Sequence, residues 1–177
     1  MATVPSPITF VDNTVVTAAD LNTIRDALNF LLAPPLAIVN QSSATQNLSS
    51  GVWTAILFDT EVIDRDGMHS TSSNTSRLTC VTPGYYAVEG MVAFHANATG
   101  GRGADFAING TRVFATAVLL ETNDSATFYS AVAVVGTVYL NVGDYLELQG
   151  VQYSGGTLST GILPDLGCSL TARWMST

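Results

Sequence analysis

The sequence predicts an all-β protein, an antiparallel β-sandwich of the jelly-roll type, with one short α-helix near the N-terminus. Hydrophobic residues make up 47% of the 177 residues and charged residues only 11%, against roughly a quarter in an average globular protein. The other polar residues are mainly Ser, Thr, Asn and Gly, which suit strands and turns better than exposed helices. Beyond residue 35, short alternating segments follow one another without a helical pattern between them, which is typical of a sandwich.

The helix is expected at about residues 18–32. Thr17 is a candidate N-cap, and Asp20, three residues later, can complete a capping box and favour the positive end of the helix. Pro34 ends the helix, because a proline restricts the residue before it to extended geometry. Apolar residues recur at helical spacing along one face. This apolar stripe consists of Leu21, Ile24, Leu28, Leu31 and Leu32.

A helix of this length is marginally stable alone in water, so the apolar stripe must pack on something. One candidate partner is the body of the same subunit, and the other is a sister subunit or a docking protein. The sequence favours neither. Pro34-Pro35 then divides the chain into an N-terminal anchor, residues 1–35, and a jelly-roll domain, residues 36–177.

The strands are identified by alternation of polar and apolar residues and by the turns that separate them. The clearest turns are Pro83-Gly84, residues 141–144 and Asn109-Gly110, a strong hairpin signal. The expected strands are residues 36–40, 52–58, 77–81, 85–95, 104–108, 112–120, 128–140, 145–153 and 168–175.

The charge distribution argues against nucleic acid and membrane as partners. The net charge is −8, there is no lysine, and the six arginines are scattered. No basic patch is therefore present to displace counterions from phosphates or to attach the chain to anionic lipid. No apolar run approaches the roughly 20 residues that span a bilayer. Residues 1–10 lack the regions of a secretory signal, so we expect synthesis in a cytoplasm.

No group of residues indicates catalysis. The two histidines, His69 and His95, form no His-x-His pair of the kind that holds metal in jelly-roll enzymes, and we expect both at the surface. A nucleophile with a base, a tuned carboxylate pair or a metal cage is what an enzyme needs. We therefore expect no enzymatic activity, no cofactor and no metal.

An acidic segment and two cysteines were each weighed as possible sites. The acidic segment has some features of a calcium loop, but the full loop pattern is missing, so a solvated turn partly neutralised by Arg65 is the preferred interpretation. Its members are Asp59, Glu61, Asp64 and Asp66. Cys80 and Cys168 have no Cys or His at metal-ligand spacing. They are expected to be small buried thiols, since cytosolic synthesis disfavours disulfides; a disulfide between them is the alternative.

Several segments of residues 36–177 follow the order found in a known family. They are Asp66-Gly67, Arg77-Leu-Thr-Cys-Val81, Thr82-Pro-Gly-Tyr-Tyr86, Ile108-Asn-Gly110, Tyr139-Leu-Asn-Val-Gly-Asp-Tyr-Leu-Glu-Leu148 and Ser169-Leu-Thr-Ala-Arg-Trp174. With them the chain resembles the trimeric jelly-roll family of tumour necrosis factor and complement-type globular heads. The resemblance implies a homotrimer, which also protects edge strands. The aromatic residues that could lie in the core of the subunit or at the threefold axis are Tyr85, Tyr86, Phe128, Tyr129, Tyr139, Tyr145 and Trp174.

The N-terminal part resembles the opening of virion proteins from tailed phages of actinobacteria, called minor tail, fibre or head-decoration proteins. The matching segments are Thr3-Val-Pro-Ser-Pro7, Val16-Thr-Ala-Ala-Asp-Leu-Asn22 and Asn29-Phe-Leu-Leu-Ala-Pro-Pro35. This resemblance implies a non-enzymatic structural protein of the virion, made in the host bacterial cytoplasm and bound to other capsid or tail proteins. The candidates for virion docking or trimer contact are Leu21, Ile24, Leu28, Leu31 and Leu32.

The alternative function is a host-receptor or glycan-binding head of a tail fibre. Sugar binding at such heads uses exposed aromatic residues, and Tyr153 beside the loop of residues 154–156 is a candidate. A second candidate is a loop around residues 100–103. Both segments are equally well explained as turns, so the sequence assigns no sugar site.

Overall fold

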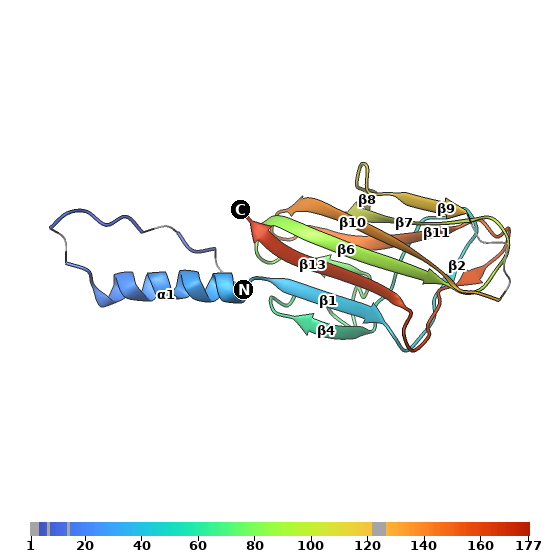
Figure 1. Ribbon diagram of the computed structural model, residues 1–177, viewed down its shortest axis with the longest axis horizontal. Coiled ribbons are helices and arrows are strands. Elements are labelled where there is room, and N and C mark those ends of the chain that lie inside the picture. The colour runs from blue at the N-terminus through green and yellow to red at the C-terminus, as the bar shows by residue number, and fades with distance from the viewer. Residues whose placement is uncertain (1–3, 7, 14, 122–126) are drawn as a thin grey trace.

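The body of the protein consists of two antiparallel sheets packed face to face, and helix α1 (Ala18–Leu32) extends from one end of it (Figure 1). The residues that the computed structural model describes are 4–6, 8–13, 15–121 and 127–177. Thr3 and Pro7, which belong to the N-terminal resemblance, lie outside these residues. The predicted all-β jelly-roll sandwich with a short N-terminal helix is confirmed.

The first sheet has five strands in the order β10-β6-β13-β1-β4. Their bounds are β10 (Ser130–Leu140), β6 (Gly84–Phe94), β13 (Cys168–Ser176), β1 (Leu36–Gln41) and β4 (Thr60–Asp64). Strands β1 and β13 come from opposite ends of the jelly roll and are hydrogen-bonded neighbours, with Leu36 opposite Arg173. Strands β6 and β10 pair along their whole length, from Gly84 opposite Leu140 to Phe94 opposite Ser130.

The second sheet is built around β11 and β7, which pair from Leu146 opposite Ile108 to Gln152 opposite Arg102. Its strands are β3 (Thr54–Ala55), β11 (Tyr145–Gln152), β7 (Gly101–Ile108), β8 (Thr111–Arg112), β5 (Arg77–Thr79) and β9 (Val118–Glu121). A separate small ladder joins β12 (Leu158–Ser159) to β2 (Asn47–Leu48). Asn109 and Gly110 both have positive φ, 51° and 78°, as the predicted hairpin turn between β7 and β8 requires.

The core lies between the two sheets and follows the alternation of the strands. Val88 and Val92 of β6 and Phe106 of β7 are among its buried residues. The buried Tyr86 hydroxyl donates a hydrogen bond to the Thr82 carbonyl at 2.6 Å, which satisfies the polar end of an otherwise apolar side chain. Each fully buried aliphatic side chain contributes about 1.5–3 kcal/mol relative to an exposed one, so the two inner faces hold the body together.

Helix α1 begins and ends where the sequence predicts. The Thr17 hydroxyl accepts a hydrogen bond from the Asp20 backbone N–H, and the Asp20 carboxylate accepts one from the Thr17 N–H at 2.8 Å, which completes the capping box. Phe30 is the buried residue of the helix, and its ring meets that of Trp174 edge to face at 4.8 Å. The described chain before the helix runs back beside it, and Val4 packs against the core (Figure 1).

Two predicted strands differ from the observed ones. Within residues 52–58 only β3 is regular; Ile56 and Phe58 still donate to Leu148 and Thr75 carbonyls, but these partners lie on different segments, so no ladder continues. Residues 112–120 divide into β8 and β9. Ala115 has a φ of 65°, a conformation that bends the chain out of a strand.

Three strands were not predicted at all: β2, β4 and β12. Strand β4 contains Glu61 and Asp64 of the acidic segment, so the prediction of a solvated acidic turn was wrong for these residues. Acidic side chains at these positions interrupt the alternation of polar and apolar residues by which a strand is recognised in a sequence. The structure shows an edge strand instead, paired with β1 through Ala37 opposite Asp64.

Candidate interaction surfaces

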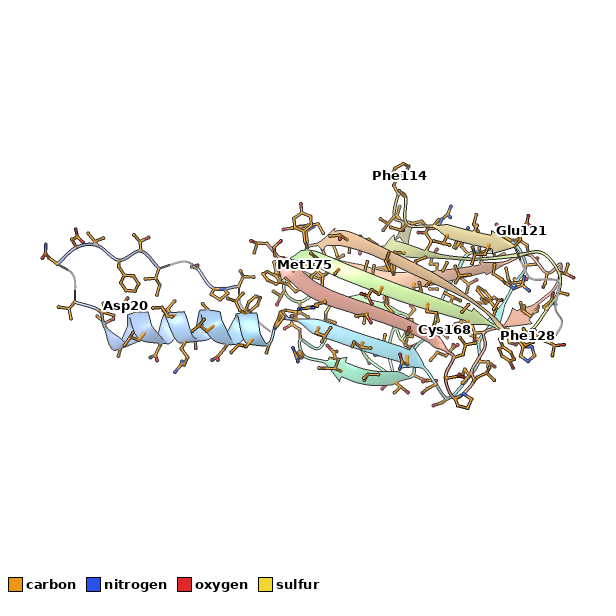
Figure 2. All side chains as sticks on the ribbon, viewed as in Figure 1. Asp20, Phe114, Glu121, Phe128, Cys168 and Met175 are labelled. Carbon is orange, nitrogen blue, oxygen red and sulfur yellow. The ribbon has the colours of Figure 1, made fainter. Side chains whose placement is uncertain are left out.

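The apolar stripe of α1 is exposed to solvent. The exposed fractions are 58% for Leu21, 36% for Ile24, 54% for Leu28, 69% for Leu31 and 80% for Leu32. The body of the same subunit therefore does not cover the stripe, although it covers Phe30 on another side of the helix. In Figure 2 Asp20 marks the end of α1 far from the body and Met175 marks the junction with it.

A second surface with exposed apolar side chains is the outer face of the first sheet, where β10, β6 and β13 lie side by side (Figure 1). Tyr139 of β10 stands opposite Tyr85 of β6, and their rings meet edge to face at 5.0 Å. Val135, 72% exposed, stands opposite Glu89. We call this surface the outer sheet face; its residues are Tyr85, Ala87, Glu89, Met91, Ala133, Val135, Thr137, Tyr139, Ser169, Thr171 and Arg173.

A groove of about 440 Å³ connects the apolar stripe to the outer sheet face. It contains Leu31 at the end of the stripe, Pro34 after the helix, and Ala87 and Arg173 of the outer sheet face. Trp174 and Met175 complete its lining. The stripe, the groove and the sheet face therefore form one continuous surface on the same subunit.

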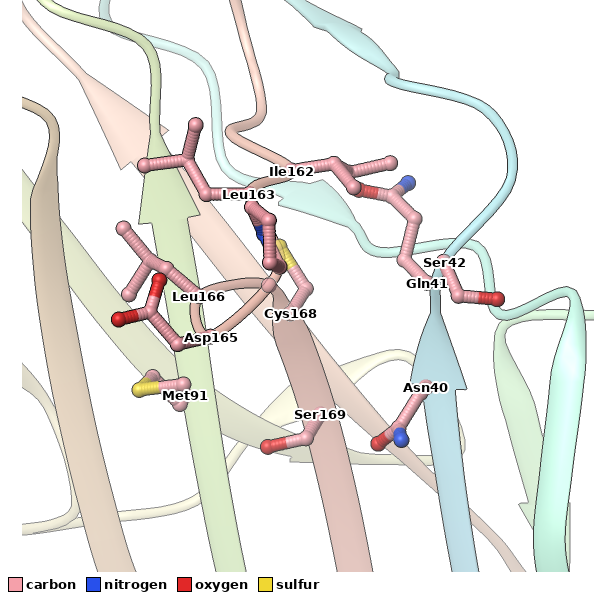
Figure 3. A pocket seen from close by; sticks show the side chains of 12 residues that line it. Asn40, Gln41, Ser42, Met91, Ile162, Leu163, Asp165, Leu166, Cys168 and Ser169 are labelled. Atoms are coloured by element: carbon pink, nitrogen blue, oxygen red, sulfur yellow. The ribbon is translucent and has the colours of Figure 1, made fainter.

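A larger groove, of about 690 Å³, lies at the other end of the outer sheet face. Figure 3 shows Asp165 and Leu166 close to Met91 on one side of it, and Gln41 and Ser42 on the other. Gln41 is buried, and its Nε2 donates to the Leu57 carbonyl at 3.2 Å. The groove offers hydrogen-bonding groups and apolar walls but no nucleophile beside a base among the residues that line it.

The carboxylates of the acidic segment accept hydrogen bonds from neighbouring loops. Burial raises the pKa of Asp59, but hydrogen bonds from the Ser42, Ser43 and Ala44 N–H groups and the Thr60 hydroxyl outweigh it and lower the pKa to about 2. Of the other members, Asp64 accepts from the Met68 and His69 N–H groups, and the buried Asp66 accepts from the Thr82 hydroxyl. Within the described part of the chain, no group of three or more His, Cys, Asp or Glu could hold a metal ion.

His69 is the clearest correction to the sequence analysis. Its side chain is fully buried rather than at the surface, with Nδ1 3.0 Å from Glu61 Oε1 and Nε2 3.1 Å from the Thr75 carbonyl. The nearest signal in the sequence is Glu61, eight residues before His69, which supplies the carboxylate that the imidazole contacts. His95 is exposed, as predicted.

Cys80 and Cys168 are free and buried, as the favoured interpretation of the sequence had them. Burial raises the pKa of both thiols to about 11. A thiol with so high a pKa is protonated at neutral pH and is a poor nucleophile.

The candidate aromatic and sugar-binding residues differ in burial, and Tyr129 and Tyr145 are partly exposed. Tyr86 and Trp174 are core residues, whereas Tyr85, Tyr139 and Phe128 are exposed. Tyr153 is 46% exposed and could be reached by a ligand. The predicted loop at residues 100–103 is wrong, because β7 begins at Gly101 and Arg102 is buried. Its guanidinium donates to three backbone carbonyls, those of Asn97, Thr99 and Gly101.

No protein-family model and no curated protein matches the chain. Solved structures do. Murine APRIL aligns with 17% sequence identity over 79% of this chain and 99% of its own, with a TM-score of 0.56. The globular domain of zebrafish complement 1qA aligns with 12% identity over 80% of this chain and 97% of its own, with a TM-score of 0.55.

The chain has the fold of these proteins. The expected likeness to tumour-necrosis-factor and complement-type jelly rolls is therefore confirmed at the level of fold. The likeness of the N-terminal part to phage virion proteins is matched by neither structure and stays a prediction. The described part of the chain has no helix long and apolar enough to cross a membrane.

Proposed function

We propose that the protein is a non-enzymatic structural component of a tailed bacteriophage particle. It acts as a homotrimer on the virion surface, as a head-decoration or minor tail protein. The observation that carries this proposal is the continuous exposed surface formed by the apolar stripe, the groove at Leu31 and the outer sheet face. Large contiguous apolar patches on soluble proteins are interaction sites.

The trimer buries the outer sheet face. The fold is that of complement-type heads, which the sequence resemblance describes as trimeric, and a face with Val135, Tyr139 and Tyr85 exposed is costly to leave in water. A stable interface buries about 800 Å² on each partner, and the outer sheet face extends over three strands, of which β6 and β10 have 11 residues each. Sedimentation velocity of the purified chain tests this: a trimer is expected, and a monomer at all concentrations contradicts it.

The virion role is supported by the N-terminal resemblance. Cryo-electron microscopy of particles of the phage that encodes the chain tests it. Threefold density repeated over the capsid would identify a decoration protein that docks through residues 1–35. Density at the tail would identify a minor tail protein, and particles without the chain would refute the proposal.

A host-receptor or glycan-binding head is the second candidate function. The exposed Tyr153 favours it, because carbohydrate binding uses exposed aromatic surfaces. Retention of the purified protein on host cell-wall glycan, reduced by Tyr153→Ala, is the expected result for this function. Equal retention of the parent protein and the Tyr153→Ala variant would show that Tyr153 takes no part in glycan binding.

A further inference from the structure

The apolar stripe has the spacing of a coiled coil. Leu21, Ile24, Leu28 and Leu31 are separated by three, four and three residues, which places them at the a and d positions of two heptads. A helix that packs on a globular core presents a wider apolar face instead. Asn22, Asn29 and Asp26 occupy the outer positions b and f, so polar side chains lie on the side of the helix away from the seam.

The seam lies on a side of the helix that its own chain leaves open. Phe30 packs on Trp174, and it follows Leu28 by two residues, about 200° around the helix. The Phe30 contact therefore attaches α1 to the body on the side of the helix opposite the seam. In Figure 1 the helix extends beyond the body, roughly in line with the strands of the sandwich.

We propose that the seam binds the same helix of two sister subunits, so that three copies of α1 form a parallel coiled coil on the threefold axis. This inference rests on the proposed trimer. The groove that contains Leu31, Ala87 and Arg173 makes the seam continuous with the outer sheet face. The subunits that cover the sheet face therefore bring their helices together at the same end.

The flanking residues match a parallel arrangement of identical chains. Asp20 is at position g and Arg25 at position e, five residues later, where g of one chain meets e of its neighbour in a parallel coil. The next such pair, Ala27 and Leu32, is apolar on both sides. Within the subunit Arg25 pairs with the adjacent exposed Asp26, a contact of little energetic value that an interchain pair can replace.

The composition of the seam and its length set the conditions for assembly. Leu at a followed by Ile at d, as in Leu21 and Ile24, favours more than two strands. The helix is 15 residues long, which gives about 22 Å at 1.5 Å per residue. Two heptads are too short to associate alone, so the jelly-roll bodies must hold the three helices together.

The test places a single reactive cysteine on the helix of the full chain. Leu28→Cys lies in the seam and Asn29→Cys, its neighbour, on the outer side; Cys80 and Cys168 are buried and do not compete. Each variant is treated with a short bismaleimide and run on a denaturing gel, and its oligomeric state is measured by sedimentation. Leu28 is exposed in the subunit, so its replacement leaves the body folded.

The expected result is a trimer for both variants, with covalent dimers formed by Leu28→Cys and few by Asn29→Cys. Trimers with equal cross-linking at the two positions, or none at Leu28→Cys, would overturn the coiled coil and leave the trimer standing. Monomers in both variants and in the parent chain would overturn the trimer and the coiled coil together.

Discussion

At the scale of single residues, Gly84 shows how one position constrains the sandwich. Its φ is 147°, and an added Cβ would lie 2.4 Å from the Ser176 carbonyl oxygen and 2.5 Å from Trp174 Nε1. The same Nε1 donates to the Pro83 carbonyl at 3.0 Å. The turn before β6 and the end of β13 therefore meet at a point where no side chain fits.

Gly84→Val is expected to lower the free energy of unfolding by at least about 2 kcal/mol, because strain in the backbone adds to the steric clash. Urea denaturation measures it. Gly156→Val is the matched control, since Gly156 has open space around its Cβ position and no positive φ. Equal stability of the two variants would mean that the β6 turn relaxes at little cost.

Asp59 makes the stability of the folded protein depend on pH in the acidic range. Its folded pKa, about 2, is below the ordinary 3.8, so its contribution is complete above pH 3.8 and is lost as the pH falls towards 2. Asp59→Asn is expected to lower the melting temperature near neutral pH and to flatten its decline over that acidic range. Thermal unfolding followed across pH tests this, with the exposed Asp165→Asn as control. An unchanged pH profile would contradict the role of the Ser42–Ala44 loop contacts.

At the scale of secondary-structure elements, the helix was predictable in full and the strands in part. Thr17, Asp20 and Pro34 are local signals, and local signals determine where a helix begins and ends. Strands β2 and β12 are two residues long, too short to alternate, and they exist only because distant segments meet. The burial of His69 likewise depends on Phe58 and Thr75, which reach it through the fold.

Leu28→Asp is expected to weaken or abolish the trimer while the subunit stays folded, because an unpaired charge buried in an interface costs several kcal/mol. Sedimentation velocity and circular dichroism measure the two properties. Asn29→Asp adds the same charge to the adjacent, polar side of α1 and should leave the assembly intact. A Leu28→Asp protein that assembles and docks like the parent would show that the anchor assignment is wrong.

At the scale of the whole molecule, the order of turns and strands predicted the jelly roll, but not which faces stay exposed. The alternation of β10 shows two faces, one with Val132 and Val134 and one with Ala133 and Val135, and both are apolar. Only the three-dimensional arrangement shows that the first packs inside and the second outside. The candidate surface was therefore predictable on the helix and hidden on the sheet.

Val135→Arg is expected to dissociate the trimer without unfolding the subunit, because the longer side chain cannot fit between packed subunits and its charge, even opposite Glu89, would have to leave water. Phe114→Arg is the control: Phe114 is 98% exposed and projects from the segment between β8 and β9 (Figure 2). Light scattering and thermal unfolding separate the two effects. A Val135→Arg trimer as stable as the Phe114→Arg trimer would show that the trimer interface lies on another face.

The central place of β13 has a consequence for biosynthesis. This strand, Cys168–Ser176, fills the gap between β6 and β1, yet the ribosome makes it more than a hundred residues after β1. Until it emerges, both neighbours carry unpaired edges and the sheet stays in two parts. Such distant pairings make folding slow and leave a nascent chain prone to aggregation. Rapid synthesis of the protein is therefore expected to favour aggregation of chains that still lack β13.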